Sequence, residues 1–317
     1  MANKLIVTAA PHITSADSTS KIMGRVCIAL LPTLIASVLI FGFQALLLTA
    51  VTVAACVVFE YAYCKLVGRD VTISDLSAVV TGLLLAFNLP AGLPVWMSLV
   101  GAFIAIVIIK QLFGGLGYNF ANPAIVGRIA MALGFTGAMT SYTYPENGID
   151  ALASATPLAV EETAQNAGSY VTLLLGNHGG VLGETCAITL LIGGIYLIWT
   201  KVISPTIPVT YLATVAVFSL LCGYDPIYQL LSGGLLLGAF FMATDYVTSP
   251  TTTKGKLVFG IGLGIITCAI RFLGRMNEGV SFAILLMNLM VPYIEVLTRQ
   301  DRLGIAKVKK SKEGAAK

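Results

Sequence analysis

The sequence predicts an all-α polytopic membrane protein, with ten transmembrane helices that form two inverted five-helix repeats. Three observations lead to this prediction: the composition, a series of apolar runs, and an internal echo between the two halves. Of the 317 residues, 57% are hydrophobic and 11% are charged, and the mean hydropathy is +0.89. Soluble domains of this size are less apolar, so the composition excludes a soluble enzyme.

Ten apolar runs approach the length of about 20 residues that crosses a bilayer as a helix. The predicted spans are 26–42, 44–64, 75–89, 94–113, 122–139, 183–200, 205–223, 228–244, 256–272 and 279–298. The run 75–89 stops at Asn88, and the run 122–139 opens with Asn122, so both predict broken or half-length helices. Irregular backbone survives at membrane depth only where protein or a cavity satisfies its polar groups. The two breaks therefore indicate an internal site.

The two halves of the chain resemble each other. The sequence GLLLAF at 82–87 is echoed by GLLLGAF at 234–240, and QLFGG at 111–115 is echoed by RFLGR at 271–275. Five spans per unit is an odd number, so the two units must cross the membrane in opposite directions. Inverted repeats of this kind place their functional site at the interface between the repeats.

The distribution of Lys and Arg predicts the side on which each segment lies. With a cytoplasmic N-terminus, all 19 basic residues except Arg271 and Arg275 fall in cytoplasmic segments or at cytoplasmic ends of spans. Between Arg128 and Lys201 the sequence contains no Lys or Arg, which predicts an extracytoplasmic loop there. The net charge of +4 therefore reflects topology, and it gives no support for nucleic-acid binding.

These patterns divide the chain into five segments. They are a cytoplasmic N-terminal segment at 1–25, a first repeat at 26–139, an extracytoplasmic loop at 140–182, a second repeat at 183–298 and a basic cytoplasmic tail at 299–317. The N-terminal residues lack the compact apolar segment and cleavage site of a secretory signal peptide. We therefore expect a multi-pass protein of the cell (inner) membrane with both termini in the cytoplasm.

The cysteines and histidines limit the possible cofactors. The six cysteines are scattered through the spans without paired spacing, which excludes a disulfide framework or a metal cluster of this chain's own. A single cysteine that donates to a cluster shared with a partner subunit stays possible. Both histidines, His12 and His178, lie outside the spans, so a bis-histidine haem within the bilayer is excluded. Electron transfer through this chain would need another cofactor.

One short stretch of the outer loop carries chemistry-bearing side chains in a fixed order. Asp150 is followed by Ser154 and Thr156. By composition alone, these hydroxyls are ordinary turn or helix-cap groups. The sequence has no glycine-rich phosphate loop, nucleophile elbow or metalloprotease helix.

Over nearly its whole length the chain resembles the D subunits of Rnf complexes and the related B subunits of the sodium-pumping NADH:quinone oxidoreductase. The resemblance rests on the segments PHI at 11–13, GGLGYNFANPA at 114–124, FMATD at 241–245 and TSP at 248–250. The family's flavinylation pattern is an Asp followed by a small-residue pair and Thr, which Asp150, Ser154 and Thr156 match. The resemblance implies that Thr156 carries FMN through a phosphoester, installed by a separate flavin transferase. Because the quinone-reductase subunit has a longer N-terminal region, the length favours the Rnf member.

The resemblance also implies a second, non-covalent flavin, usually riboflavin, near the spans. Its amide ligands are expected at Asn119 and Asn122, although both asparagines equally fit a role as caps of broken helices. Negative charge on the covalent FMN would be balanced by partner subunits or by Arg271 and Arg275. The protein is then a subunit of an ion-translocating ferredoxin:NAD oxidoreductase complex, which relays electrons through flavins while sodium or protons move.

Four acidic residues at or near the membrane are candidates for ion handling, since ionisable groups at membrane depth are often functional. Topology places all four near the cytoplasmic side, and Asp245, beside the matched FMATD segment, is the first candidate for ion entry. The four are Glu60, Asp75, Asp245 and Glu295.

Three alternatives to the Rnf interpretation stay open. The first is the quinone-reductase subunit, with similar chemistry. The second is a channel or secondary transporter, since inverted repeats with broken helices are transporter architecture. The third is a structural membrane subunit without a flavin. Each of the last two leaves the pattern from Asp150 to Thr156 without a role.

Overall fold

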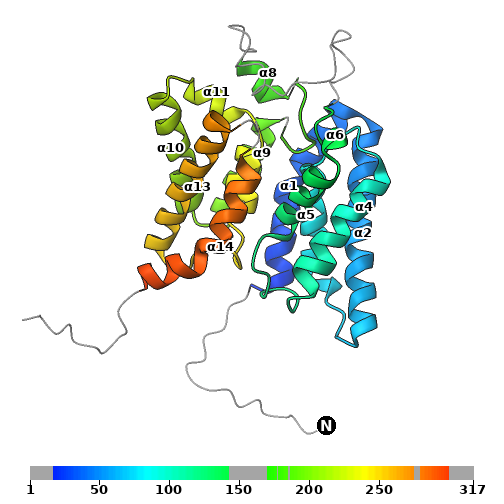
Figure 1. Cartoon of the computed structure of the whole chain (residues 1–317). Helices are drawn as coiled ribbons and strands as arrows, with labels where there is room; N and C mark the ends of the chain where they lie inside the picture. The colour runs from blue at the N-terminus through cyan, green and yellow to red at the C-terminus, as the bar shows by residue number, and fades with distance from the viewer. Residues whose placement is uncertain (1–16, 143–169, 177, 185, 275–278, 300–317) are drawn as a thin grey trace, which may run out of the picture.

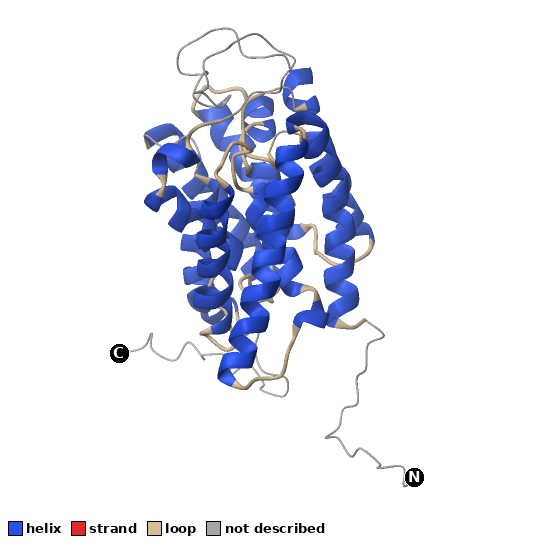
Figure 2. Ribbon diagram, turned by 90° about the vertical axis from the view of Figure 1, so that its right-hand side faces the viewer, coloured by secondary structure: helices blue, strands red, loops and turns tan. Residues whose placement is uncertain are grey.

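The chain folds as a bundle of helices (Figure 1). The computed structural model describes residues 17–142, 170–176, 178–184, 186–274 and 279–299. Within these ranges every regular element is a helix, as the colouring of Figure 2 makes plain. The helices α1 (Thr19–Phe41) and α14 (Val280–Thr298) define two ends of the bundle. We call the end where α1 begins and α14 ends the terminal end, and the opposite end, near α8 (Tyr170–Leu175), the loop end.

The first half of the chain supplies a long hairpin and then a series of shorter helices. After α1 it contains α2 (Phe43–Val67), η1 (Ile73–Asp75), α3 (Ser77–Phe87), α4 (Val95–Phe103), η2 (Ile104–Gln111), α5 (Pro123–Gly134) and α6 (Thr136–Met139). The second half starts with α8 and ends with α14. Between them lie α9 (Ala187–Trp199), α10 (Thr206–Leu221), α11 (Pro226–Leu231), α12 (Leu235–Leu237), η3 (Gly238–Met242) and α13 (Thr253–Leu273).

The helices have the length and surface of a membrane protein. Four of them, α1, α2, α13 and α14, are long and apolar enough to cross a membrane, and five shorter apolar helices accompany them. Large apolar side chains such as Leu39 and Trp199 are 80% exposed on the outer helices. Exposed apolar surface on this scale is what lipid covers in a bilayer. The prediction of an all-α membrane protein is therefore confirmed at this level.

Two predicted helix breaks are present in the structure. Helix α3 has only 11 residues and ends at Asn88, whose side-chain amide donates to Leu84 O at 2.7 Å. Helix α5 begins directly after Asn122, whose Oδ1 accepts from the backbone N of Ala124 at 3.1 Å. Both asparagines thus satisfy backbone groups at a helix end. For Asn122, the capping role considered from the sequence is confirmed.

Two predicted boundaries are wrong. The first helix starts at Thr19 rather than 26, because the Ser18 hydroxyl accepts from Lys21 N at 3.3 Å and caps the helix earlier. The predicted span 228–244 is not one helix, since α11 ends at Leu231 and α12 begins at Leu235. Gly233, at φ +70°, makes the turn between them.

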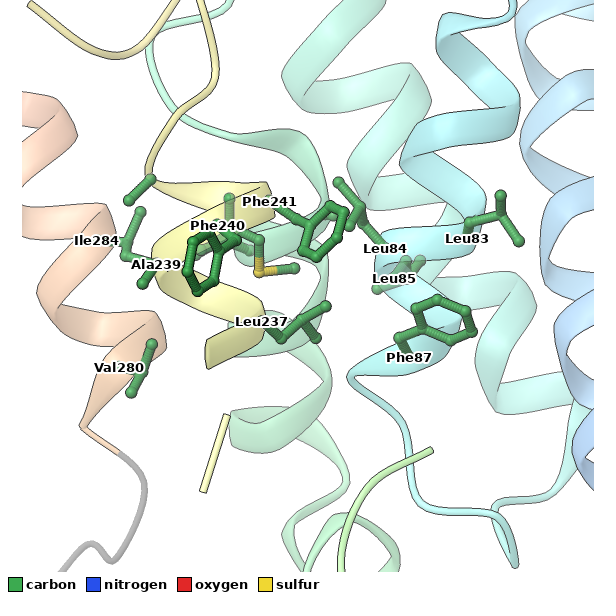
Figure 3. Close-up of a cluster of buried hydrophobic side chains, with 14 of the residues drawn as sticks. Leu83, Leu84, Leu85, Phe87, Leu237, Ala239, Phe240, Phe241, Val280 and Ile284 are labelled. Carbon is green, nitrogen blue, oxygen red and sulfur yellow. The ribbon is translucent and has the colours of Figure 1, made fainter. Parts of the chain in front are cut away.

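The short helices of the two halves meet at the centre of the bundle. Figure 3 shows α3 side chains facing those of α12 and η3, with the ring of Phe241 directed toward Leu84. The chain after α8 packs onto the same place, because the backbone N of Leu182 donates to Leu89 O at 3.1 Å and the backbone N of Gly183 donates to Phe87 O at 2.8 Å. We call residues 181–183 the strap. It covers the end of α3, where helical carbonyls would otherwise lack donors.

Gly183 is required at this contact by space rather than by its own backbone angles. A Cβ added there would lie 2.4 Å from the Cβ of Phe87. The strap can approach α3 closely only because residue 183 has no side chain.

The helices pack in matching pairs within each half. Helix α2 packs on α4, as α10 packs on α13, and α5 packs on α4, as α14 packs on α13. Across the halves, α1 packs on α9 and α5 packs on α14. Both halves also contain a π-helical stretch, η2 and η3, in which the hydrogen bonds run between residues five apart. Wide turns of this kind are often found at functional sites.

Candidate functional site: a pocket between the halves at the terminal end

A pocket lies between the two halves, near the terminal end. Its cavity volume is about 100 Å³, and the pocket is partly open to the outside. Its walls come from α1, α3, η2, α5, α9, η3 and the segments after η2, α9 and η3. Most of the lining is apolar, and the polar groups that face it include Ser77, Thr81, Lys110, Asn119, Asn122 and Asp245. A mostly apolar cavity with a few fixed polar groups is the usual form of a cofactor site.

The structure brings together the three predicted residues of this region. Asn119, Asn122 and Asp245 all line the pocket. Asn122 Nδ2 donates to Met242 O at 3.3 Å, which ties the start of α5 to the end of η3. Asn119 Nδ2 donates to Ala121 O at 3.0 Å. Its side chain also hydrogen-bonds the Asp245 carboxyl.

Asp245 lies in the connection between η3 and α13 and is partly exposed. Thr248 Oγ1 donates to its Oδ2 at 3.1 Å, and the backbone amides of Tyr246 and Val247 also donate to the carboxyl. Surrounding protein raises the pKa of Asp245, because burial disfavours the charged form, while these hydrogen bonds and the one with Asn119 oppose the shift. The carboxyl is thus held in place at the pocket by its hydrogen bonds.

A residue that the sequence analysis did not single out, Asn288 on α14, completes this network. Its Oδ1 accepts from Asn122 N at 3.1 Å, and its Nδ2 donates to Thr248 O at 3.0 Å. It therefore bridges the Asn122 cap and the segment after Asp245. Its position inside an apolar helix was the available signal, since buried polar residues in membrane helices are usually hydrogen-bonded.

The pocket wall also contains a buried ion pair. Lys110 Nζ lies 2.7 Å from Glu60 Oε2 and 2.5 Å from Ser77 Oγ. The lysine is 2% exposed and the glutamate 0%. Desolvation of two charges is offset only when their mutual hydrogen bonds are good. Here Thr72 Oγ1 donates to Glu60 Oε1, the second carboxylate oxygen, at 2.8 Å.

The network continues from the pair toward the surface. Ser77 Oγ and Ser77 N both donate to Asp75 Oδ1, at 2.5 and 2.7 Å. Asp75 is partly exposed, and Thr72 is exposed. Of the four acidic residues proposed for ion handling, Glu60 and Asp75 are thus joined in one network beside the pocket, and Asp245 lies on the pocket itself. Glu295 lies apart and accepts from Thr251 N at 3.2 Å.

A second group of buried charges lies toward the loop end. Arg271 Nη1 donates to Gln229 O at 2.8 Å, and Nη2 donates to Ser232 O at 3.1 Å, both at the end of α11. Arg128 donates to Ser281 Oγ on α14. Glu184, which follows the strap, is 1% exposed and interacts electrostatically with both arginines. Arg271 is 8% exposed and donates to carbonyls of this chain, and its role in balancing the charge of an external FMN stays a prediction.

Several predicted site residues lie outside the described residues. Asp150, Ser154, Thr156 and Arg275 belong to this group. The flavinylation pattern therefore stays a prediction from the sequence. Among the residues that the structure does describe, no group of three His, Cys, Asp or Glu side chains could hold a metal ion.

The comparisons with known proteins agree with one another over nearly the whole chain. The model of the NQR2, RnfD, RnfE family matches residues 6–304. The D subunit of the Na(+)-translocating ferredoxin:NAD(+) oxidoreductase complex of Acetobacterium woodii is 47% identical over 310 residues, which cover 96% of this chain and 97% of the relative. The proton-translocating counterpart of Clostridium ljungdahlii is 40% identical over 320 residues, with 95% and 97% covered. The D subunit of the ion-translocating oxidoreductase complex of Actinobacillus succinogenes is 35% identical over 348 residues, with 94% and 97% covered.

Proposed function

The chain belongs to the NQR2, RnfD, RnfE family, and from that premise we propose that it is the D subunit of an ion-translocating ferredoxin:NAD(+) oxidoreductase complex. The observation that carries the proposal is the near-full-length similarity to subunits of that description, at 47% and 40% identity. The same similarity favours the ferredoxin complex over the quinone reductase. One relative is described as sodium-translocating and the other as proton-translocating, so the proposal covers both ions.

We place the chain in the cell membrane as ten spans in two inverted repeats, with the terminal end in the cytoplasm and the loop end outside. The matching helix pairs of the two halves support the repeats. The basic residues support the orientation, because the sequence between Arg128 and Lys201 contains no Lys or Arg, and α6 and α8, which belong to this stretch, lie at the loop end. The pocket then opens toward the cytoplasm, and residues 140–182 are extracytoplasmic.

In this arrangement Thr156 carries FMN as a phosphoester made by a flavin transferase, with Asp150 and Ser154 as parts of the recognised sequence. The support is the family pattern and the position of these residues in the outer loop. A phosphoester would keep the flavin at the outer face and leave its ring free for electron transfer. Partner subunits supply the ferredoxin and NAD sites and balance the charge of the phosphate.

The pocket holds a second, non-covalent flavin such as riboflavin. A bound flavin supplies an electron carrier there. The residues present fit it: the pocket is partly open, its walls are mainly apolar, and a few polar groups, among them Asn119 and Asp245, line it. The Asn119 amide, held at Ala121 and Asp245, is placed to bond the polar edge of the ring. Asn122 fixes the wall of the pocket through its cap and its bond to Met242.

Asp245 serves ion entry from the cytoplasmic side. It borders the pocket, and its carboxyl is oriented by Thr248. Replacing Asp245 by Ala is expected to lower ion pumping by reconstituted vesicles more than it lowers flavin content. Unchanged pumping would remove Asp245 from the ion path.

The proposed flavin attachment is tested by in-gel fluorescence of the denatured protein, co-expressed with a flavin transferase. We expect fluorescence in the wild-type band and none with Thr156→Val. Thr163→Val is the matched control, since it removes a threonine hydroxyl from the same predicted loop, outside the pattern from Asp150 to Thr156. Absence of fluorescence in every sample, while the transferase labels a second substrate, would contradict the covalent flavin and favour a transporter.

A further inference from the structure

Lys110 is the only lysine or arginine that lines the pocket within the described residues. It lies in the π-helical stretch η2, near its C-terminal end. Its charge is already balanced by Glu60 at 2.7 Å. The pair therefore adds no net charge to the pocket, but it places an ammonium group in a wall that is otherwise mainly apolar.

One of the three N–H donors of the Lys110 ammonium group is not used by the described residues. A lysine side chain carries three N–H donors. Two of them point at Glu60 Oε2 and Ser77 Oγ, and the described residues provide no acceptor for the third. A ligand in the pocket can supply that acceptor.

The geometry of Lys110 is fixed before any ligand enters. Glu60 is itself held by Thr72 at 2.8 Å, and Ser77 is held by its bond to Asp75. A donor that is already oriented costs little reorganisation when charge develops beside it. Lys110 therefore has the position and the rigidity of an electrostatic partner for a redox-active ligand.

We propose that Lys110 donates its third hydrogen bond to the flavin ring in the pocket and that it thereby favours the reduced form of that flavin over the oxidised form. This inference rests on the proposed function of the pocket. When two electrons and one proton are added to the ring, the ring gains one negative charge, and no bond to the protein forms or breaks. The electrons come from the partner subunits of the complex, and the proton comes from water at the open side of the pocket. The nearby ammonium interacts more strongly with the charged ring than with the neutral one.

The test compares two variants of the full-length chain, so that the effect of the Lys110 cation is separated from the effect of the Lys110–Glu60 ion pair. Both carry Thr156→Val, so that the pocket is the only flavin site. The first adds Glu60→Gln, which keeps Lys110 and an acceptor for it. The second adds Glu60→Gln together with Lys110→Met, which removes both charges and leaves no unpaired ion in the wall.

The measurement is the dissociation constant of riboflavin for each variant in detergent, once oxidised and once reduced under anaerobic conditions. Compared with Thr156→Val alone, the Glu60→Gln variant lacks the carboxylate charge beside Lys110, so we expect its ratio of the two constants to favour reduced riboflavin at least as strongly. In the second variant, the loss of Lys110 should raise the dissociation constant of reduced riboflavin, relative to that of oxidised riboflavin, by about tenfold or more compared with the Glu60→Gln variant. The reason is that a hydrogen bond to a charged group is lost. Lys110→Arg, which keeps a cation, should retain part of the preference.

The outcomes distinguish the inference from the proposed function. If Thr156→Val alone binds no riboflavin, the pocket is not a flavin site and both fail. If riboflavin binds with the same ratio after Lys110 is removed, the pocket is a flavin site and only the role of Lys110 is overturned. Thermal unfolding of each variant checks that a changed ratio does not come from a damaged fold.

Discussion

The two ends of the molecule each contain a buried cation, but the cations have different partners. Lys110 at the terminal end pairs with the carboxylate of Glu60, whereas Arg271 at the loop end donates to carbonyls at the end of α11. The internal echo pairs Arg271 with Gln111, the residue after Lys110. Corresponding helices thus carry a cation near the same point. The difference teaches that such a cation indicates a binding site only where a cavity adjoins it, as it does for Lys110.

The largest expected effect is that of Lys110→Met on stability. The substitution leaves the carboxylate of Glu60 buried without its cation, which should cost about 3 to 5 kcal/mol. Thermal unfolding of the detergent-solubilised protein measures the loss. The double variant Glu60→Gln/Lys110→Met should recover most of it, and a single variant as stable as the wild type would mean that the pair is not ionised.

Arg271→Met should have a smaller effect, of a different kind. It removes charge-assisted hydrogen bonds to Gln229 O and Ser232 O, and one such bond is worth about 1.5 to 3 kcal/mol. Because these bonds share one guanidinium, their contributions are not additive, and stability should fall by about 2 to 3 kcal/mol. Riboflavin affinity should stay unchanged, since Arg271 does not line the pocket. Arg271→Lys is the control that keeps the charge. A change in riboflavin affinity would contradict the division between the two ends.

Gly183→Ala tests the packing of the strap on α3. The added methyl would lie 2.4 Å from Phe87 Cβ, and overpacking of this kind costs about 1 to 3 kcal/mol. Faster hydrogen exchange at the amides of Leu182 and Gly183 would locate the damage. Gly137→Ala, where no atom lies within 4 Å of the added carbon, is the matched control. Equal behaviour of the two variants would show that the strap is not tightly packed.

The smallest effect concerns acid sensitivity at the loop end. Burial lowers the pKa of His178, and a bond with the Thr172 backbone opposes the shift. The unfolded chain therefore binds the proton more readily, so this contribution to stability is present above about pH 6.5 and is lost as the pH falls toward the lowered pKa. His178→Gln should flatten the pH dependence of thermal unfolding below about pH 6.5. If the unfolding temperature of the variant depends on pH as strongly as that of the wild type, the acid sensitivity comes from other groups.

Much of the fold could be predicted from the sequence, because lipid demands long apolar helices. The same physics made the breaks at Asn88 and Asn122 recognisable, since a polar amide inside an apolar run usually satisfies free backbone groups. The break between α11 and α12 was missed. Leucines continue on both sides of Gly233, so the apolar character does not fall where the helix stops.

The candidate site was predicted in part. Asn119, Asn122 and Asp245 were found through resemblance, and the structure places them on one pocket. Lys110 and Glu60 could not be paired from the sequence, because each lies near the end of a span, where a charged side chain usually reaches the interface. Fifty residues separate them, and only the packing of α2 on η2 brings them together.

The wide turns of η2 and η3 have a consequence for insertions and deletions. Each turn of a π-helix holds about one residue more than an α-helical turn. In an α-helix, removing a residue rotates all that follows by about 100°. In η2 a deletion between 104 and 109 can be absorbed by a return to α-helical geometry, so that the segment after η2 keeps its orientation. The chain can therefore lose a residue in η2 with less disturbance to the pocket than in the α-helical walls formed by α1 and α3.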